Sequence, residues 1–200
     1  MGKCLVYIHG KGGTAEEAQH YVPLFAGHEV IGFDYQTQTP WEAQAEFSHF
    51  FSKLSGKYEQ ITIVANSIGA FFALHALKDV NIFEAYFISP IVNMEKLITN
   101  MMQRAGVSIE ELKQRRIIET AFGESLSYPY LDWVQNYPIN WHTKTHILYG
   151  SKDNLQSLKD IQAFAAQSGA DVTIMENGEH WFHTKEQMQF LDNWILKKIA

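Results

Sequence analysis

The sequence has few of the features that mark secreted, membrane-spanning or nucleic-acid-binding chains. Its single cysteine, Cys4, cannot form an internal disulfide, which fits a reducing compartment. No apolar run is long enough to span a bilayer, and no charged segment followed by a long apolar stretch marks a secretory signal. Lysine and arginine form no cluster, and the formal net charge is −6. The sequence therefore predicts a cytoplasmic protein without nucleic-acid or membrane partners, and it leaves the oligomeric state open.

What the sequence does contain is a regular alternation of short apolar strands and amphipathic helices. With 200 residues, 46% of them hydrophobic, the chain is long enough for one domain with a sizeable core. Such alternation is typical of a parallel sheet covered by helices on both faces. We therefore predict an α/β fold, a three-layer α/β/α sandwich around a mostly parallel sheet. The predicted strands are residues 3–9, 29–34, 61–65, 85–89, 145–150 and 171–176.

Four short segments mark the beginnings of helices. Each has Ser or Thr followed three residues later by Glu or Gln, the pattern of a capping box. These segments are "TAEE" (14–17), "TPWE" (39–42), "SIEE" (108–111) and "TKEQ" (184–187). Pro40 falls at the first helical position, where its missing N–H costs nothing. The aromatic stripe that follows it, Phe47, Phe50, Phe51 and Leu54, has helical spacing and is assigned to the core.

One segment interrupts the alternation. Residues 91–142 are expected to hold two or three helices and no strand, and they carry a methionine-rich helical stripe from Met94 to Met102. An insertion between successive strands of such a sheet is commonly a cap over the site, although a longer helical crossover is the alternative. We therefore treat residues 1–200 as a single domain with 91–142 as a helical cap insertion. Its apolar residues line a pocket or form the insertion's own small core.

Chemically reactive side chains follow three of the predicted strands. Ser67 stands at the strand–helix turn in "ITIVANSIGAFFAL", Asp153 follows the fifth strand in "YGSKDNL", and His180 follows the last strand in "ENGEHWFH". Open α/β sheets place their sites at the carboxyl ends of the strands, so these three residues are expected to meet. The chain order Ser, Asp, His is that of α/β hydrolases, not of chymotrypsin or subtilisin.

With these motifs the sequence resembles the α/β-hydrolase superfamily, particularly its small bacterial esterase-like members. The resemblance covers nearly the whole chain apart from the predicted cap. The family sheet usually has eight strands, so about six strands here imply a reduced version of that fold. The family's nucleophile turn is G-x-S-x-G, and here Ala65 replaces the first glycine while Gly69 keeps the second. Some bacterial lipases in the superfamily carry the same alanine.

The resemblance implies a role for each of the three residues. Ser67 is the expected nucleophile and His180 its general base, with His183 as the rival base. Asp153 is the expected acid that holds the imidazole tautomer, and Asp132 in the insertion is a poor second choice.

The loop "HGKGG" (9–13) resembles the family's H-G-x-x-G, which supplies backbone N–H groups to an oxyanion hole. The expected donors are the N–H groups of Ile68 and Lys11, with Gly10 or Gly12 as the fallback for Lys11. As a phosphate loop or dinucleotide fingerprint, the same stretch fails on spacing. The nine histidines form no cluster with metal-ligand spacing, so neither a metal nor another cofactor is expected.

These features predict a serine hydrolase that forms an acyl-enzyme with a small-molecule acyl substrate. A small ester is favoured, and thioester and amide substrates remain open. Asp34 and Trp41, which follow the second strand, are candidate substrate-binding residues. The alternative is a non-catalytic ligand-binding or signalling member of the fold. A third possibility is lyase or cofactor-free oxygenase chemistry with the same residues.

Overall fold

A computed structural model describes residues 2–200 of the chain. Helices and strands alternate along most of it. The elements are β1 (Gly2–Ile8), the 3₁₀ helix η1 (Ala15–Tyr21), β2 (His28–Phe33), α1 (Pro40–Ser55), β3 (Tyr58–Asn66), α2 (Ser67–Ala76), β4 (Glu84–Ile88), α3 (Met94–Ala105), α4 (Ile109–Arg115), β5 (Ile117–Glu119), β6 (Ser125–Ser127), α5 (Tyr128–Asn136), β7 (Thr145–Gly150), α6 (Leu158–Ser168), β8 (Asp171–Met175) and α7 (Lys185–Ile199). Among residues 2–200, no helix combines the length and apolar character needed to cross a membrane.

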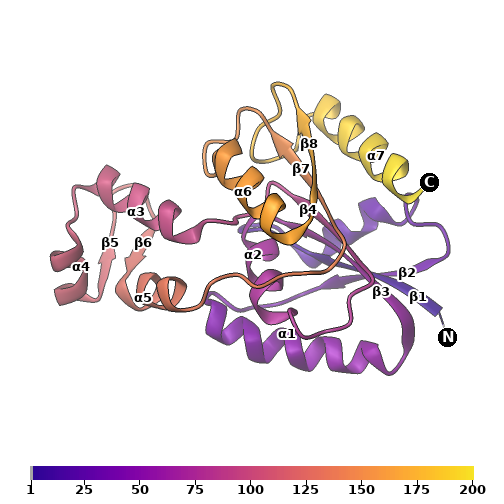
Figure 1. The fold of residues 1–200 in the computed structure, drawn as a ribbon, viewed down its shortest axis with the longest axis horizontal. Coiled ribbons are helices and arrows are strands. Elements are labelled where there is room, and N and C mark those ends of the chain that lie inside the picture. Colours follow the sequence, from indigo (N-terminus) through magenta and orange to yellow (C-terminus); the bar gives the residue numbers. More distant parts are fainter. Residues whose placement is uncertain (1) are drawn as a thin grey trace. The chain divides into compact units, whose positions relative to one another are not determined.

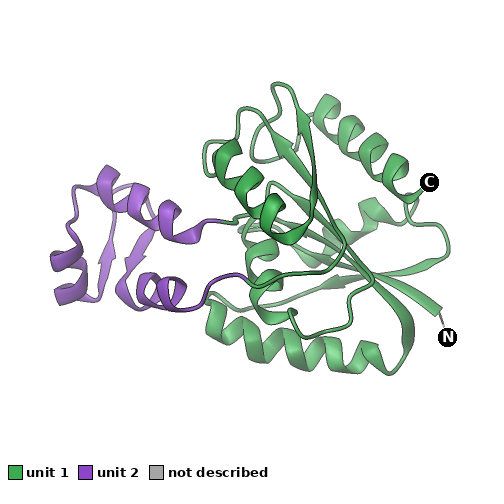
Figure 2. Cartoon of the chain, in the orientation of Figure 1, with its two compact units in different colours: residues 1–92, 140–200 green, residues 93–139 purple. Residues whose placement is uncertain are grey.

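The chain divides into two compact units (Figure 2). The first comprises residues 1–92 and 140–200 and contains the main sheet, and the second comprises residues 93–139. The predicted role of the insertion as a cap remains a prediction.

The main sheet has six strands in the order β2-β1-β3-β4-β7-β8, and every neighbouring pair is parallel. All six strands predicted from the sequence are present, with boundaries shifted by at most a few residues. Right-handed crossovers place α1, α2 and α6 on one face of the sheet and η1 on the other (Figure 1). The α/β fold and the three-layer arrangement are therefore confirmed.

Both faces of the sheet are covered by apolar side chains. On one face, Leu5 and Tyr7 of β1 share a buried cluster with Tyr21 and Phe25 near η1 and with Trp194 of α7. On the other face, Phe47 and Phe51 of α1 are fully buried, as the helical spacing predicted. This double coverage explains why the central strands read as continuous hydrophobic runs.

The predicted caps are present at the beginnings of the helices. The backbone N–H groups of Glu42, Glu111 and Gln187 donate to the hydroxyl oxygens of Thr39, Ser108 and Thr184. At Thr14 the capping box begins a 3₁₀ helix instead of an α-helix.

The expectation that residues 91–142 contain no strand is wrong. β5 and β6 pair antiparallel, with Ile118 opposite Leu126, and a turn containing Gly123 at φ 82° joins them. Each strand is 3 residues long with one buried side chain, too short to show an alternating pattern in the sequence. The second unit also holds the predicted helical stripe, of which Met94, Ile98 and Met102 are buried.

Candidate active site

The turn between β3 and α2 exposes Ser67 at a strand–helix junction. Ser67 has φ 50°, a left-handed conformation that non-glycine residues adopt at a cost of roughly 1–3 kcal/mol. Gly69 is required two residues later, because a Cβ there would lie 2.2 Å from the carbonyl oxygen of His9. Ala65 is fully buried between β1 and β4, so the turn accommodates its methyl group. The turn therefore tolerates an alanine at the first glycine position of G-x-S-x-G, whereas it has no room for a side chain at the second.

The structure brings Ser67, His180 and Asp153 into one hydrogen-bonded row. Ser67 Oγ lies 2.8 Å from His180 Nε2, and His180 Nδ1 lies 2.7 Å from Asp153 Oδ2. The Asp153 side chain is fully buried, and that of His180 is 14% exposed. The other carboxylate oxygen, Asp153 Oδ1, accepts hydrogen bonds from the backbone N–H groups of Leu155 (2.8 Å) and Gln156 (3.0 Å). These donors fix the rotation of the carboxylate and leave Oδ2 directed at the imidazole.

The loops that carry Asp153 and His180 are joined directly to each other. The N–H of Lys152 donates to the carbonyl of Gly178 at 2.8 Å, and the N–H of Asn177 donates to Ser151 Oγ at 2.8 Å. A Cβ on Gly150 would lie 2.4 Å from the carbonyl oxygen of Gly178, so the loops approach as closely as they do because Gly150 has no side chain. The glycines before Asp153 and His180 thus allow the two loops to lie against each other.

The loop after β1 packs against the serine turn. A Cβ on Gly10 would lie 3.3 Å from the Cβ of Ser67, which places this loop directly beside the serine. Lys11 lies in a tight turn closed by a 3.1 Å hydrogen bond from the N–H of Gly13 to the carbonyl of Gly10. Ile68 lies in the first turn of α2, where backbone N–H groups have no partner within the helix. Both segments predicted to supply N–H donors therefore flank Ser67.

Tyr35 holds this loop from the side of β2. Its ring stacks on the imidazole of His9 at 4.2 Å between centroids, and its hydroxyl donates to the carbonyl oxygen of His9 at 2.7 Å. Burial raises the pKa of Tyr35, so the hydroxyl stays protonated and donates. Tyr35 itself is buried, and its ring also packs against Phe47 of α1 and Phe72 of α2.

A second row of hydrogen bonds begins at Asn66, next to Ser67, and was not predicted from the sequence. The amide Nδ2 of Asn66 donates to the hydroxyl of Tyr7 at 2.9 Å, and that hydroxyl donates to the carboxylate of Glu17. Burial raises the pKa of Tyr7 well above its ordinary value. The sequence signal for it was the polar residue Asn66 between the apolar run 63–65 and Ser67.

The other sequence candidates lie in different surroundings. Asp34 is exposed and accepts a hydrogen bond from Gln36 Nε2 at 3.1 Å, and Trp41, in the first turn of α1, is 38% exposed. His183 stacks on Trp181, and its Nδ1 lies 2.7 Å from the carbonyl oxygen of Trp181. The hydrogen-bonded partner of Ser67 is therefore His180, and not the rival His183.

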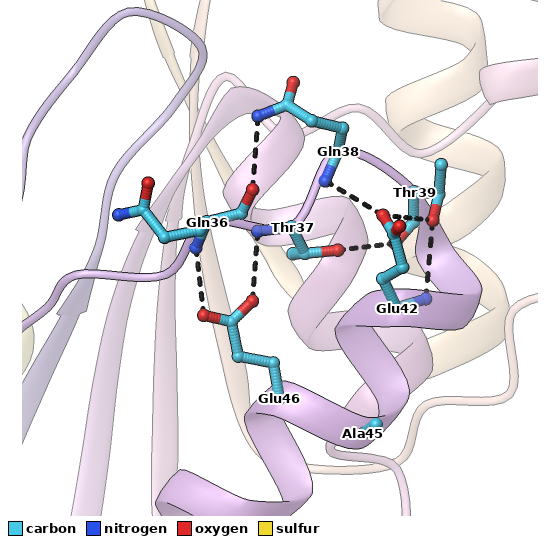
Figure 3. A pocket seen from close by; sticks show the side chains of 7 residues that line it. All are labelled: Gln36, Thr37, Gln38, Thr39, Glu42, Ala45 and Glu46. Atoms are coloured by element: carbon cyan, nitrogen blue, oxygen red, sulfur yellow. Dashed lines mark hydrogen bonds between the residues drawn. The ribbon is translucent and has the colours of Figure 1, made fainter.

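A shallow pocket lies beside the loop between β2 and α1 (Figure 3). It is lined by Gln36, Thr37, Gln38, Thr39, Glu42, Ala45 and Glu46. The Glu46 carboxylate accepts from the backbone N–H groups of Gln36 and Thr37, and the Glu42 carboxylate accepts from the Thr39 hydroxyl (Figure 3). Both carboxylates are thus occupied in holding the loop, and neither Asp34 nor Trp41 lines the pocket.

We also searched the described residues for a possible metal site. Across residues 2–200, no group of three or more His, Cys, Asp or Glu side chains is arranged to hold a metal ion. The buried Cys4 lies on β1, and burial raises the pKa of its thiol to about 11.

No family model matches the chain, and no curated protein matches it. Solved structures are similar to it over nearly its whole length. It is 17% identical to Est1E from Butyrivibrio proteoclasticus, with a TM-score of 0.74 over 99% of this chain and 86% of that one. It is 18% identical to mouse alpha/beta hydrolase domain-containing protein 10, with a TM-score of 0.75 over 100% and 92% of the two chains. For the esterase Pf2001 from Pyrococcus furiosus, the identity is 17% and the TM-score 0.61, over 98% and 80%. The chain therefore has the α/β-hydrolase fold.

Proposed function

We propose that this protein is a serine hydrolase that cleaves a small ester through Ser67, His180 and Asp153 and an acyl-enzyme intermediate. The observation that carries the proposal is the row of two hydrogen bonds, 2.8 Å from Ser67 Oγ to His180 Nε2 and 2.7 Å from His180 Nδ1 to Asp153 Oδ2. The fold supports the proposal, because the similar structures include an esterase, Pf2001, which was solved in two crystal forms. Thioesters and amides are the other acyl substrates that the same chemistry would cleave.

The hydrogen bonds of Asp153 favour the imidazole tautomer that catalysis needs. Because backbone N–H groups donate to Asp153 Oδ1, the carboxylate stays ionised and its Oδ2 accepts a hydrogen bond from the Nδ1–H of His180. Nε2 then carries a lone pair directed at Ser67 Oγ, so His180 takes the hydroxyl proton as the serine attacks a substrate carbonyl. The resulting imidazolium donates to the buried carboxylate and is stabilised by it. It next protonates the leaving group, and water cleaves the acyl-enzyme by the same steps.

The negative oxygen of the tetrahedral intermediate requires donors that already point toward it. We assign this role to the backbone N–H groups of Ile68 and Lys11, because their segments flank Ser67. The N–H of Ile68 lies at the positive end of the α2 dipole, which favours negative charge there. Asp34 and Trp41 remain the proposed substrate contacts.

Active-site labelling tests the proposal most directly. A fluorophosphonate probe reacts with a serine hydroxyl only where a base activates it and an oxyanion site receives the phosphoryl oxygen. We expect it to label the wild type and the control Ser52→Ala, whose exposed hydroxyl lies on α1, and not Ser67→Ala. Failure of the folded wild type to react would leave the non-catalytic binding protein as the better explanation.

The substrate class requires a separate measurement. A panel of p-nitrophenyl esters of increasing acyl length, run beside acyl-coenzyme A and amide substrates, measures kcat/KM for each class. We expect the esters to give the highest values. If an acyl-coenzyme A gives a higher kcat/KM than every ester, the protein is a thioesterase.

A further inference from the structure

Two glutamine side chains are buried in the first unit, and both contact loops of the candidate active site. Gln156 is 4% exposed and Gln187 is 5% exposed. Burying an amide is costly unless both its oxygen and its nitrogen find partners, so a buried glutamine marks a place where backbone groups need a donor and an acceptor together.

Gln156 closes the turn that orients Asp153. Its backbone N–H donates to Asp153 Oδ1 at 3.0 Å, and its side-chain Nε2 donates to the carbonyl oxygen of Leu155 at 2.9 Å. Its carbonyl oxygen accepts from the hydroxyl of Tyr149 on β7 at 3.0 Å. The residue is therefore held on both its backbone and its side chain, and the turn that supplies two N–H donors to Asp153 is held with it.

The same side chain joins this turn to the segment beside Ser67. Gln156 Oε1 accepts from the backbone N–H of Val92 at 3.0 Å. The neighbouring Ile91 donates its N–H to the carbonyl oxygen of Ser67 at 3.2 Å. One short path of hydrogen bonds thus runs from the Asp153 turn, through Gln156 and residues 91–92, to the backbone of Ser67.

Gln187 performs the matching role for the histidine loop. Its Oε1 accepts from the backbone N–H of His183 at 3.2 Å, and its Nε2 donates to Glu179 Oε2 at 3.2 Å. These contacts lie on either side of His180 in the chain. Gln187 itself is fixed in the first turn of α7, where its N–H donates to Thr184 Oγ1 at 3.2 Å.

We propose that Gln156 and Gln187 are positioning residues that align Asp153 and His180 with Ser67. The proposal rests on the proposed hydrolase function, and neither glutamine is assigned a contact with substrate. Productive proton transfer requires the three groups within about 0.5 Å of their working positions, which depends on the residues that hold their loops. A glutamine fits each place because one amide supplies both the acceptor and the donor.

The test for Gln156 replaces it with methionine, which has similar volume and no amide. The matched control is Gln162→Met, at an exposed position on α6. We expect Gln156→Met to lower kcat for a p-nitrophenyl ester by about 10- to 100-fold with KM changed less than about 3-fold. Gln162→Met should match the wild type. If Gln156→Met does not fold, Gln156→Glu keeps the acceptor for Val92 and loses the donor, and it should show the same split. A folded variant whose kcat is unchanged overturns the role of Gln156.

The test for Gln187 exchanges the donor and the acceptor of its hydrogen bond with Glu179. Gln187→Glu places a second carboxylate against Glu179, so we expect kcat to fall about 10-fold. Adding Glu179→Gln restores a donor opposite the new carboxylate, and kcat should return to within about 3-fold of the wild type. Glu179→Gln alone should be nearly neutral, because two amides still form the bond. A double variant as slow as Gln187→Glu overturns the role of Gln187, since a general loss of stability would not be rescued in this way.

The two proposals fail in different ways. If Ser67→Ala retains the esterase activity, the proposed function is wrong. If Ser67→Ala is inactive while the folded Gln156 and Gln187 variants keep their kcat, the hydrolase stands and only the positioning roles are wrong.

Discussion

The substitution Asp153→Asn isolates the role of the buried carboxylate, because the two groups have almost the same shape. Asp153 Oδ1 accepts from the N–H groups of Leu155 and Gln156. In the variant the amide oxygen must take that place, because the reverse orientation would set an NH₂ group against two N–H donors and lose both hydrogen bonds. The amide nitrogen is then forced to face His180 Nδ1, 2.7 Å away in the wild type.

This orientation reverses the tautomer of His180. An NH₂ group donates to Nδ1, so the ring proton moves to Nε2, where it points at Ser67 Oγ and leaves no lone pair for the hydroxyl proton. Triads with the wrong tautomer lose about 10⁴-fold in kcat, which corresponds to roughly 5 kcal/mol in the barrier. Folding should change much less, by about 1 kcal/mol, because all three hydrogen bonds persist in neutral form.

The assay compares kcat for a p-nitrophenyl ester with the melting temperature of each variant. The control is Asp132→Asn on α5, the second choice of acid from the sequence, which should retain full activity. If Asp153→Asn keeps more than about a tenth of wild-type kcat, the tautomer argument is wrong. If Asp132→Asn loses as much as Asp153→Asn, the acid has been misassigned.

Three further substitutions test the stability of the first unit. Gly69→Ala would set a Cβ 2.2 Å from the carbonyl oxygen of His9, so we expect a loss of activity and a destabilisation of at least about 2 kcal/mol by urea unfolding. Burial lowers the pKa of His75 from 6.5 to about 4, so the unfolded chain takes up this proton first as the pH falls. The wild type should lose about 2 kcal/mol of unfolding free energy between pH 7.5 and 5.0 that His75→Gln does not lose. Burial alone would raise the pKa of Glu84, but hydrogen bonds, that of Lys144 among them, lower it overall. Its contribution to stability is therefore full above the unfolded value of 4.5 and is lost as the pH falls below it, a loss that Glu84→Gln should not show in acid titrations followed by circular dichroism.

The strands of the main sheet were predictable because each is apolar enough to be recognised alone. Residues 61–65 of β3 and 85–88 of β4 are buried on both faces, so mainly β-branched and aromatic residues follow one another there. Capping residues such as Thr39 and Thr184 are equally local, since the hydroxyl bonds an N–H three residues along the chain. β5 and β6 escaped prediction for the converse reason: a three-residue strand with one buried side chain differs little from a loop.

The same distinction separates the site residues that the sequence indicates from those that it does not. Ser67, Asp153 and His180 were found because each follows a strand and has a glycine two or three residues away, and parallel strands bring such ends to the same edge of the sheet. Gln156 carried no such mark, although its contact with Val92 spans 64 residues of sequence. A glutamine that bonds backbone groups can pair with any residue, so no second residue type in the sequence reveals the partnership.

The alanine at position 65 shows that the two glycine positions of the G-x-S-x-G pattern are not equally constrained. A small residue stands at each position, but the two have different neighbours. At Gly69 any side chain meets the His9 carbonyl, whereas at Ala65 a methyl group is already buried in the sheet. We therefore expect Ala65→Gly to fold and to turn over substrate normally, losing about 1 kcal/mol of stability from the strand. Gly69→Ala, in contrast, should lose its activity together with the larger loss of stability given above. Equal tolerance at both positions would show that the approach of α2 to the loop after β1 does not limit this turn.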